Sequence, residues 1–369
     1  MQRGSSPRPI IKYITTSTDG VNWIKIGDMP HFGRIVTSTE EKITREGAKK
    51  SRLVKKGDLI LSNSMSYGLP YIMGVDGYIH DGWFVLKDFE DTFDKDYLCN
   101  LLISSAIQNQ YKRLAAGGVV QNISSDLVNS VSASIPLMEE QKKISSLLNL
   151  IDDRIATQNK IIEDLKKLKS AIIDYAINSL DTDFGKFGSL YEMAGEGGTP
   201  TTSNASFYDN GKIPFIKIDD LKQKYLIENN DFITELGLQK SSAWLVPTRS
   251  ILFSNGATIG EITITTYPVC TKQGILGIVP KQSIDVEFLY YFMSSSYFKK
   301  AVGRIVTEGT MKTAYLKDIN NILCPIPTKE KQQEIVKMPS ALNSKIDFEQ
   351  SILKLFCSQK QHLLRQMFI

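Results

Sequence analysis

A long helical pattern that occurs twice constrains this chain more than any other feature. The string IPLMEEQKKI begins at Ile135, and IPTKEKQQEI begins at Ile326, 191 residues later, with five of the ten positions identical. After each string, apolar residues recur at alternating steps of three and four, which is the spacing of a coiled-coil seam. The pattern predicts two long helices of near-equal length that pair with each other.

The predicted seam uses matching positions in both copies. Polar residues coincide as well, because Gln158 and Glu349 share one seam position and Lys169 and Lys360 share another. At about 1.5 Å per residue, roughly 40 residues of helix span about 60 Å, so we expect a spacer and not a core element. The apolar seam residues are Ile144, Leu148, Ile151, Ile155, Ile162, Leu165 and Ile172 in the first copy and Ile335, Leu342, Ile346, Leu353, Phe356, Leu363 and Met367 in the second.

Prolines mark both helices. We expect Pro136 and Pro327 near the first turn, because proline lacks an N–H that would have no partner there. Pro339 lies inside the second pattern and has no counterpart in the first. It predicts a break or a kink near Met338, because a proline ring clashes with the preceding helical turn.

The region before each long helix repeats as well. Short apolar runs predict strands at matching positions, at an offset of 192: Trp23–Asp28 with Phe215–Asp220, Leu59–Asn63 with Ile251–Asn255, and Gly82–Leu86 with Gly274–Ile278. Residues 97–111 and 288–301 predict helices, and the offset falls to 191 between Asp126 and Pro136. A repeat at so constant a period predicts duplicated modules.

These patterns predict a mixed α/β fold in which two long antiparallel coiled-coil helices separate two duplicated globular domains. The expected boundaries are 1–134 and 183–325 for the globular domains, and 135–182 and 326–369 for the helices. Residues 184–196 have no match at the N-terminus. We expect either that the native start lies upstream or that the tail after the second helix completes the first module.

Composition adds only broad limits. A chain of 369 residues should contain more than one domain. A net charge of +4 permits nucleic-acid binding without requiring it. The four widely spaced cysteines are typical of reduced thiols in a cytosolic protein. The sequence has neither a signal-peptide pattern nor an apolar run of the roughly 20 residues that span a bilayer, so we expect a soluble, cytoplasmic protein without membrane contact.

Catalytic patterns are weak. The three histidines have no metal-ligand spacing, and the sequence contains no phosphate-binding loop or nucleophile elbow. Asp209, Asp220 and Lys222 could hold a metal and a water as in a nuclease, but the first copy has no equivalent set. We therefore predict no catalytic, cofactor-binding or metal site, and we keep a DNA nuclease as an alternative.

Polar loops after the matched strands, with basic residues near them, are the better candidates for contact with nucleic acid. Lysine, asparagine, glutamine and serine reach phosphate oxygens and base edges without a catalytic geometry. The alternative is that they are ordinary turn residues and solvated faces. The candidates are Lys25, Lys49, Lys50, Arg52, Ser62, Asn63, Ser64, Tyr67, Gln121 and Asn122 in the first copy and Lys217, Lys240, Arg249, Ser254, Asn255, Thr258, Lys272, Gln273, Lys312 and Thr313 in the second.

The proline-led helix starts, the Ser-Asn strand ends and the duplicated order of module and helix resemble the DNA-specificity subunit of Type I restriction-modification systems. The resemblance covers essentially the whole chain. It implies two target-recognition domains that each read half of a split site on double-stranded DNA. It also implies that the helices set the spacer and dock two methyltransferase subunits.

The resemblance further implies a subunit without an active site or a cofactor of its own. Partner subunits would carry S-adenosylmethionine, and restriction subunits, with ATP and magnesium, would join through the complex as the translocase and nuclease. A coiled-coil adaptor without a DNA role remains the other alternative.

Overall fold

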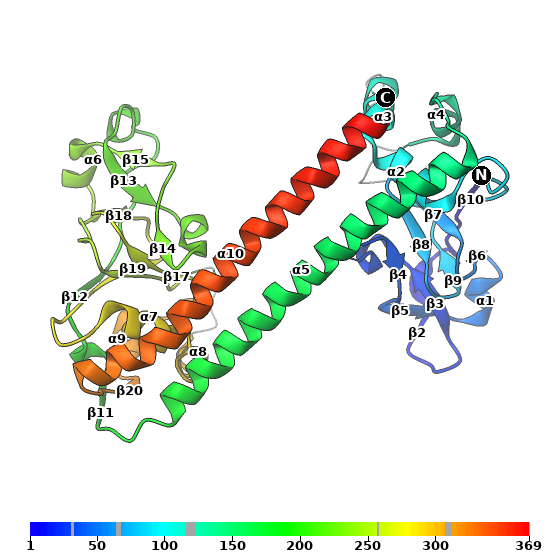
Figure 1. Ribbon diagram of the computed structural model, residues 1–369. Coiled ribbons are helices and arrows are strands. Elements are labelled where there is room, and N and C mark those ends of the chain that lie inside the picture. Colours follow the sequence, from blue (N-terminus) through cyan, green and yellow to red (C-terminus); the bar gives the residue numbers. More distant parts are fainter. Residues whose placement is uncertain (31–32, 64–67, 116–122, 257, 307–311, 369) are drawn as a thin grey trace. The chain divides into compact units, whose positions relative to one another are not determined.

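The structure, a computed structural model, describes residues 1–30, 33–63, 68–115, 123–256, 258–306 and 312–368. The chain divides into two compact units (Figure 1). Unit 1 comprises Met1–Ile161 and Glu349–Ile369, and unit 2 comprises Ile162–Phe348. Each unit therefore contains one globular domain with part of each long helix, which confirms the predicted mixed α/β fold with two sheet-containing domains.

Unit 1 contains two five-stranded sheets. The first has the strand order β1-β10-β7-β8-β4, and the second has the order β2-β5-β3-β9-β6. Their strands are β1 (Gln2–Arg3), β2 (Ile14–Thr15), β3 (Val21–Ile24), β4 (Ile35–Val36), β5 (Glu41–Ile43), β6 (Arg52–Val54), β7 (Leu59–Ser62), β8 (Pro70–Met73), β9 (Gly77–Ile79) and β10 (Trp83–Leu86). The helices are η1 (Ile10–Lys12), η2 (Ile26–Asp28), α1 (Arg45–Ala48), α2 (Lys95–Ile103), α3 (Ser105–Ala115) and α4 (Ser125–Ser130).

Unit 2 repeats the main sheet and the centre of the second sheet, while β2 and β6 of unit 1 and β11 and β20 of unit 2 have no counterpart in these sheets. Its main sheet has the order β12-β19-β16-β17-β14, which matches β1-β10-β7-β8-β4, and β15-β13-β18 matches β5-β3-β9. Its strands are β11 (Phe184–Lys186), β12 (Tyr191–Glu196), β13 (Ile213–Ile216), β14 (Tyr225–Leu226), β15 (Phe232–Ile233), β16 (Ile251–Ser254), β17 (Ile262–Thr265), β18 (Cys270–Thr271), β19 (Ile275–Pro280) and β20 (Leu323–Pro325). The helices are η3 (Phe187–Ser189), η4 (Ala205–Phe207), η5 (Ile218–Lys222), α6 (Glu235–Gln239), α7 (Val286–Ser294), α8 (Ser296–Ile305) and α9 (Leu316–Ile319).

The central strands are apolar without alternation because both faces of the sheet are covered. In β7, Leu59 and Leu61 pack with residues of α2 and α3, whereas Ile60 packs with Trp83 on the opposite side. All four residues of β7, and all four of β16, are buried. A strand buried on both faces reads as a continuous apolar run, as this one does.

Two predicted elements differ in extent. The strand predicted at Trp23–Asp28 ends at Ile24, and Lys25 caps the 3₁₀ helix η2. The N–H of Lys25 donates to the Asp28 carboxylate at 2.6 Å, and the N–H of Lys217 donates to Asp220 at 2.8 Å. An aspartate three residues after the lysine therefore ends the strand in both copies.

Each helix predicted before a glycine loop is in fact two helices. Ser104 separates α2 from α3, and Ser295 separates α7 from α8. Both serines have extended backbone, and the Ser295 hydroxyl accepts from the N–H of Phe298 as an N-cap of α8. The offset of 191 already applies at Asp94 and Asp285, which cap α2 and α7, so the residue is lost before α2 and not after Asp126 as predicted.

The long helices are α5 (Met138–Asn178) and α10 (Lys329–Met367). They begin two residues after Pro136 and Pro327, so these prolines precede the first turn and do not lie within it. α10 continues through Pro339, and the predicted break near Met338 is wrong. The ring of Pro339 is buried at a seam position, where packing offsets the backbone hydrogen bond that a proline cannot make.

The seam positions lie on the covered side of the helices. Every apolar seam residue named above is buried or half-buried. In unit 1, Gln158 donates to the Glu349 carboxylate, and Lys360 donates to Asp152. In unit 2, Lys169 donates to Asn343 at 2.9 Å, which is the counterpart of the Lys360 contact at an offset of 191. Residue numbers rise along α5 as those of their partners fall along α10, so the two helices are antiparallel.

A cation with little exposure to solvent joins each globular domain to its long helices. In unit 1, Arg34 donates to Asn100 at 2.9 Å and to Asp152 at 2.8 Å. In unit 2, Lys224 donates to Glu287, Tyr291 and Ser340 at 2.5, 3.0 and 3.1 Å. Each cation directly precedes an edge strand of the main sheet, β4 or β14. A cation before the edge strand therefore contacts a long helix in both units, an arginine in one and a lysine in the other.

The C-terminal tail packs into the first globular domain. Leu364 and Phe368 are buried in its core, and the ring centroids of Phe368 and Tyr97 lie 5.1 Å apart. Of the residues 184–196 that were predicted to have no N-terminal match, Phe184–Lys186 form β11, which pairs with β20 in unit 2. Tyr191–Glu196 form β12, the counterpart of β1, so the prediction is wrong for that strand. No helix among the described residues is both long enough and apolar enough to cross a membrane.

Candidate nucleic-acid interface

Three loops of unit 1 meet at the edge where β7 ends and β10 begins. The N–H of Gly4 donates to the carbonyl of Trp83 at 2.8 Å. The N–H of Asn63 donates to the carbonyl of Gly82 at 2.9 Å, and its side-chain amide donates to the carbonyl of Asp81 at 2.8 Å. The segment 4–8, the turn 80–82 and Asn63 at the end of β7 therefore lie together, and we call them the loop frame.

Unit 2 has an equivalent loop frame, held by the same backbone hydrogen bonds. The N–H of Gly197 donates to the carbonyl of Ile275 at 2.8 Å, and the N–H of Asn255 donates to the carbonyl of Gly274 at 3.0 Å. The N–H of Gln273 donates to the hydroxyl of Thr199 at 3.3 Å.

The last contact has its equivalent in unit 1, where the N–H of Asp81 donates to the hydroxyl of Ser6 at 3.3 Å. Gly4 and Gly197 are required at their positions in this frame. A Cβ atom on Gly4 would lie 2.0 Å from the carbonyl oxygen of His80, and one on Gly197 would lie 2.2 Å from that of Thr271. The frame is thus shared by both domains, down to the glycine that lets the chain pass close to the turn.

The Ser-Asn pairs predicted to contact DNA belong to the frame and are not available. Ser62, Asn63, Ser254 and Asn255 are at most 4% exposed. The hydroxyl of Ser62 accepts from the N–H of Leu69, and that of Ser254 accepts from the N–H of Glu261. These four predictions are wrong, because the side chains close the loops from inside and have no surface left for a ligand.

The other loop candidates divide by position. Ser64, Tyr67, Gln121 and Asn122 lie outside the described residues. Thr258 and Lys312 are exposed and Thr313 is half-buried, all in the loops beside the frame of unit 2. Lys272 and Gln273 are exposed on the turn of that frame.

The predicted basic cluster of unit 1 lies against the same frame. Arg52 donates from Nε to the carbonyl of Arg3 at 2.6 Å, and the hydroxyl of Ser5 donates to the carbonyl of Lys50 at 3.1 Å. Lys49 is exposed beside them. Arg3, Lys49, Lys50 and Arg52, which we call the basic belt, thus border the segment 4–8.

Three candidate lysines are engaged in ion pairs. Lys25 lies 2.7 Å from Glu41, and Lys217 lies 2.6 Å from Asp231, which is the same contact in both domains. A hydrogen bond with Glu41 raises the pKa of Lys25. Lys50 contacts the Tyr13 hydroxyl and lies 3.7 Å from Glu46, and the Tyr13 contact raises its pKa. All three side chains are at least partly exposed.

The last two candidates in unit 2 differ in position. Lys240 follows α6, as Lys49 of the basic belt follows α1. Arg249 is in the turn before β16, at the opposite end of that strand from the frame, and borders a hollow with Lys224 and Glu287. Arg249 has a φ of +58°, as its counterpart Gly57 has a φ of +92°, so this turn requires a left-handed residue. The structure does not bring Arg249 to the other candidates.

Sequence reasoning missed the residues that the frame presents most openly in unit 1. Arg8 lies 3.1 Å from Asp81, and the hydroxyl of Ser6 donates to Asp81 at 2.8 Å. The signal was present, because the run that begins at Gly4 resembles the run that begins at Gly197. The similarity marked the segment as part of the repeat, and the contacts with Asp81 arise only in the fold.

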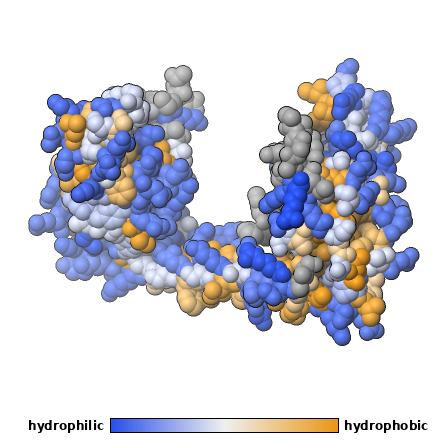
Figure 2. Space-filling model, turned by 90° about the horizontal axis from the view of Figure 1, so that it is seen from above, coloured by the Kyte–Doolittle hydropathy of each residue, from blue (hydrophilic) through white to orange (hydrophobic). Residues whose placement is uncertain are grey.

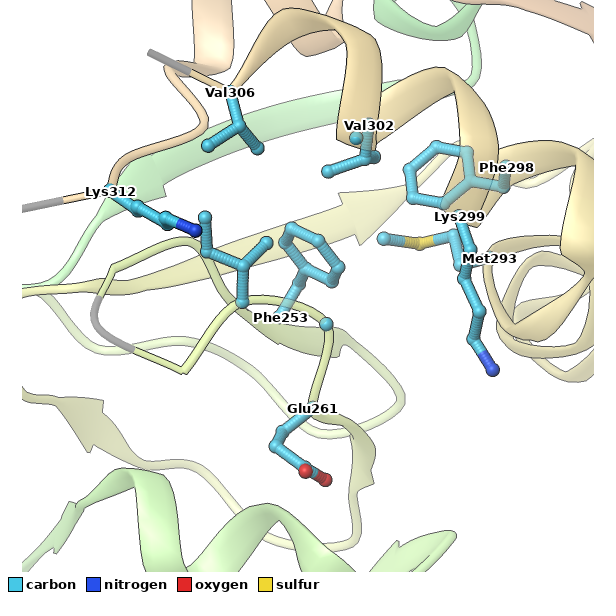
Figure 3. A pocket seen from close by; sticks show the side chains of 11 residues that line it. Phe253, Glu261, Met293, Phe298, Lys299, Val302, Val306 and Lys312 are labelled. Atoms are coloured by element: carbon cyan, nitrogen blue, oxygen red, sulfur yellow. The ribbon is translucent and has the colours of Figure 1, made fainter. Parts of the chain in front are cut away.

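A cavity of about 540 Å³ lies beside the frame of unit 2 (Figure 3). Phe253, Met293, Phe298, Val302 and Val306 form its apolar wall, with Glu261, Lys299 and Lys312 around it. In unit 1 the counterpart of Val302 is Tyr111, whose buried ring would lie 2.7 Å from a Cβ on Gly68. The two domains share a fold and differ in how this space is filled.

The nuclease candidates do not form a site. The carboxylate of Asp220 accepts from the N–H of Lys217, and Asp28 does the same for Lys25 in unit 1. Lys222 pairs with Asp219 at 2.9 Å on the surface. Among the described residues, no group of three or more histidine, cysteine, aspartate or glutamate side chains could hold a metal ion. Asp220 has a capping role that both copies share.

Known proteins are similar to this chain in sequence and in fold. The chain is 24% identical over 362 residues to the Type I restriction enzyme MjaIX specificity subunit of Methanocaldococcus jannaschii, covering 90% of this chain and 83% of that one. It is also 24% identical to the Type I restriction enzyme HindI specificity subunit of Haemophilus influenzae, covering 71% and 74%.

Among solved structures, one reported for complex assembly and conformational transition of the type I R-M system has a TM-score of 0.63 at 16% identity, covering 99% of this chain and 93% of that one. The Type-I restriction-modification system S subunit from M. genitalium has a TM-score of 0.52 at 16% identity, covering 99% and 96%. The Type I restriction modification DNA specificity domain matches residues 8–167 and again 181–355. The chain therefore belongs to the family of Type I restriction modification DNA specificity proteins.

Proposed function

We propose that this chain is a non-catalytic subunit that selects the DNA sequence for a Type I restriction-modification complex, and that each globular domain reads one half of a split site. One observation carries the proposal. Both domains hold the same loop frame with the same backbone hydrogen bonds, while the side chains on it differ: Asp81 stands where unit 2 has Gln273, and Arg8 where it has Thr201. A common frame with different hydrogen-bonding groups suits two different half-sites.

The proposal assigns roles to the predicted segments. Residues 1–134 and 183–325 would be the two target-recognition domains, and residues 135–182 and 326–369 the spacer helices. The basic belt of Arg3, Lys49, Lys50 and Arg52 would contact phosphates next to the reading frame, since cations position a protein on DNA without reading its sequence. The relatives that carry the name specificity subunit support this assignment.

The long helices offer surface for protein partners. Figure 2 shows hydrophilic residues over much of the visible surface and hydrophobic residues gathered in places. Leu147, Leu150 and Leu355 are exposed in unit 1, and Tyr175 and Phe348 are exposed in unit 2, all on α5 or α10. Exposed apolar residues at helical spacing suit docking of another helix. We assign this surface to methyltransferase subunits, which would supply catalysis and bind S-adenosylmethionine.

Sequencing of DNA methylation tests the proposal. The chain is expressed with the methyltransferase subunit encoded beside it, in a host without other methylation of that kind. We expect methylation at a split motif, two short specified halves around an unspecified gap. Exchange of Met1–Ser134 for the equivalent domain of a relative should change one half only. If methylation is the same after deletion of this chain, the proposal is wrong.

A further inference from the structure

The Arg8 side chain is exposed and yet held in place. Its Nη2 atom lies 3.1 Å from Oδ2 of Asp81, while the side chain is 83% exposed. Oδ1 of the same carboxylate accepts from the hydroxyl of Ser6 at 2.8 Å. Ser6 therefore donates to one oxygen of Asp81 and Arg8 donates to the other.

Asp81 is itself fixed by its backbone. Its N–H donates to the hydroxyl of Ser6, and its carbonyl accepts from Asn63 at 2.8 Å and from Arg3 at 3.2 Å. Burial works to raise the pKa of Asp81, but hydrogen bonds from Ser6 and Arg8 outweigh it and lower the pKa. The carboxylate is therefore charged at neutral pH and is a firm support for a guanidinium.

The arrangement leaves most of the guanidinium open. Asp81 is its only hydrogen-bond partner among the described residues, which leaves other N–H groups of Arg8 for a ligand. Arg8 also borders a hollow of about 630 Å³ with Trp23 and His80, so a group can approach it. An arginine held by a carboxylate has lost side-chain freedom before binding, which lowers the entropic cost of a directed contact.

The nearby carboxylate favours a neutral ligand over a phosphate. The negative charge of Asp81 opposes a phosphate anion next to Arg8, whereas the belt residue Lys49 has no ion-pair partner in the part of the chain that the structure describes. The major-groove edge of guanine presents two neutral acceptors, O6 and N7, that match a guanidinium fork. The pairing with Asp81 weakens attraction to phosphate and keeps the directional donors.

We propose that Arg8, oriented by Asp81, reads a guanine in the half-site bound by the first globular domain. This inference rests on the proposed function. In unit 2 the equivalent positions are Thr199, Thr201 and Gln273, without an arginine or a carboxylate. The second half-site should therefore lack this contact, and only the first half contains a guanine that is read in this way.

The test compares methylation rates of the assembled methyltransferase complex on DNA variants in which each position of the site is changed in turn. For Arg8→Ala we expect one guanine of the first half to lose its preference over other bases by roughly 5- to 160-fold, the range expected for loss of one bidentate contact. Asp81→Asn should weaken the same position, because the arginine loses its support. Arg8→Lys should not restore it, since an ammonium cannot make the forked contact.

Arg45→Ala is the matched control, an exposed arginine of the same unit whose loss should leave every preference unchanged. An equal loss of rate on all sequences with Arg8→Ala would identify Arg8 as a phosphate contact and overturn the inference. So would a full preference at every position. Absence of any split motif with the unaltered chain would instead contradict the proposed function, so the two failures are distinguishable.

Discussion

At the scale of single residues, two glutamines show how closely the repeats agree. Gln141 is 1% exposed, and its amide donates to the carbonyls of Thr92 and Pro136 at 2.9 and 3.0 Å. Its oxygen accepts from the N–H of Asp94 at 2.9 Å. Gln332 makes the equivalent three contacts with Ser283, Pro327 and Asp285. These glutamines join the start of each long helix to the loop that caps α2 or α7.

Replacement of either glutamine should destabilise the chain. Gln141→Ala removes the partner of three backbone groups, and we expect the free energy of unfolding to fall by about 1–3 kcal/mol, as for loss of a buried hydrogen-bonding group. Gln332→Ala should cost a similar amount. Urea unfolding of the full chain measures both. Gln361→Ala, at an exposed site on α10, should change stability little, and equal effects at all three sites would contradict the assignment.

Residue roles were the hardest part to predict from the sequence. Ser62 and Asn63 have the polar chemistry of a DNA contact, and the fold uses that chemistry to close a loop. Arg8 and Asp81 are far apart in the chain, and only the frame of hydrogen bonds brings them together. A polar residue type fixes what a side chain can bond to, while exposure decides whether the partner is protein or ligand.

At the scale of elements, periodicity predicted the long helices well, because apolar residues at alternating steps of three and four lie on one side of a helix and can be buried only there. It did not predict the breaks at Ser104 and Ser295, where the apolar pattern continues across a cap. Pro339 predicted a break that does not occur, because tertiary packing can override the low helix propensity of a single residue.

The Lys224–Glu287 pair predicts a pH-dependent stability for unit 2. Burial works to lower the pKa of Lys224, but the hydrogen bonds that Lys224 donates to Glu287 and Tyr291 raise it above 10.5. Burial works to raise the pKa of Glu287, but hydrogen bonds from Lys224 and Tyr225 lower it below 4.5. The stabilisation due to Glu287 is thus fully present above pH 4.5 and is lost as the pH falls through its lowered pKa.

We expect the melting temperature of the unaltered chain to fall more steeply on acidification from pH 7 to about 3 than that of Glu287→Gln, because only the ionised carboxylate gains from Lys224. Thermal unfolding across this range provides the measurement. Glu334→Gln, in an exposed pair with Lys331, is the control and should show a small effect. A constant difference between the unaltered chain and Glu287→Gln at every pH would refute the assignment.

At the scale of the whole molecule, the duplication made the fold predictable. Two domains and two long helices follow from one repeat read against the other, and the structure confirms the two-domain mixed α/β fold, whereas the strand order within the sheets was not predicted. The repeats differ at single positions, such as Tyr111 in unit 1 and Val302 in unit 2. The sequence did not predict that a cavity forms beside Val302, because a cavity depends on every neighbour of a side chain.

The charge of the basic belt predicts a salt dependence for the complex. Lys49→Ala with Lys50→Ala should lower affinity for all DNA sequences by the same factor, because phosphate contacts carry no sequence information. The slope of log affinity against log salt should fall by about 1 for each phosphate that the double variant no longer neutralises. DNA-binding titrations at several salt concentrations measure this, with Lys167→Ala on the exposed face of α5 as control. An unchanged slope for the double variant would remove the belt from the interface.

The contact between Gln158 and Glu349 has a consequence for assembly. These residues are counterparts in the two repeats, so each faces its own equivalent across the helix pair. If identical repeats from two chains paired instead, glutamine would meet glutamine in one pairing, and two buried carboxylates would meet in the other. Like charges at a buried site are unfavourable, so the exchange costs free energy that pairing within one chain avoids. The difference between Gln158 and Glu349 therefore favours pairing of the two unlike repeats over pairing of two identical ones.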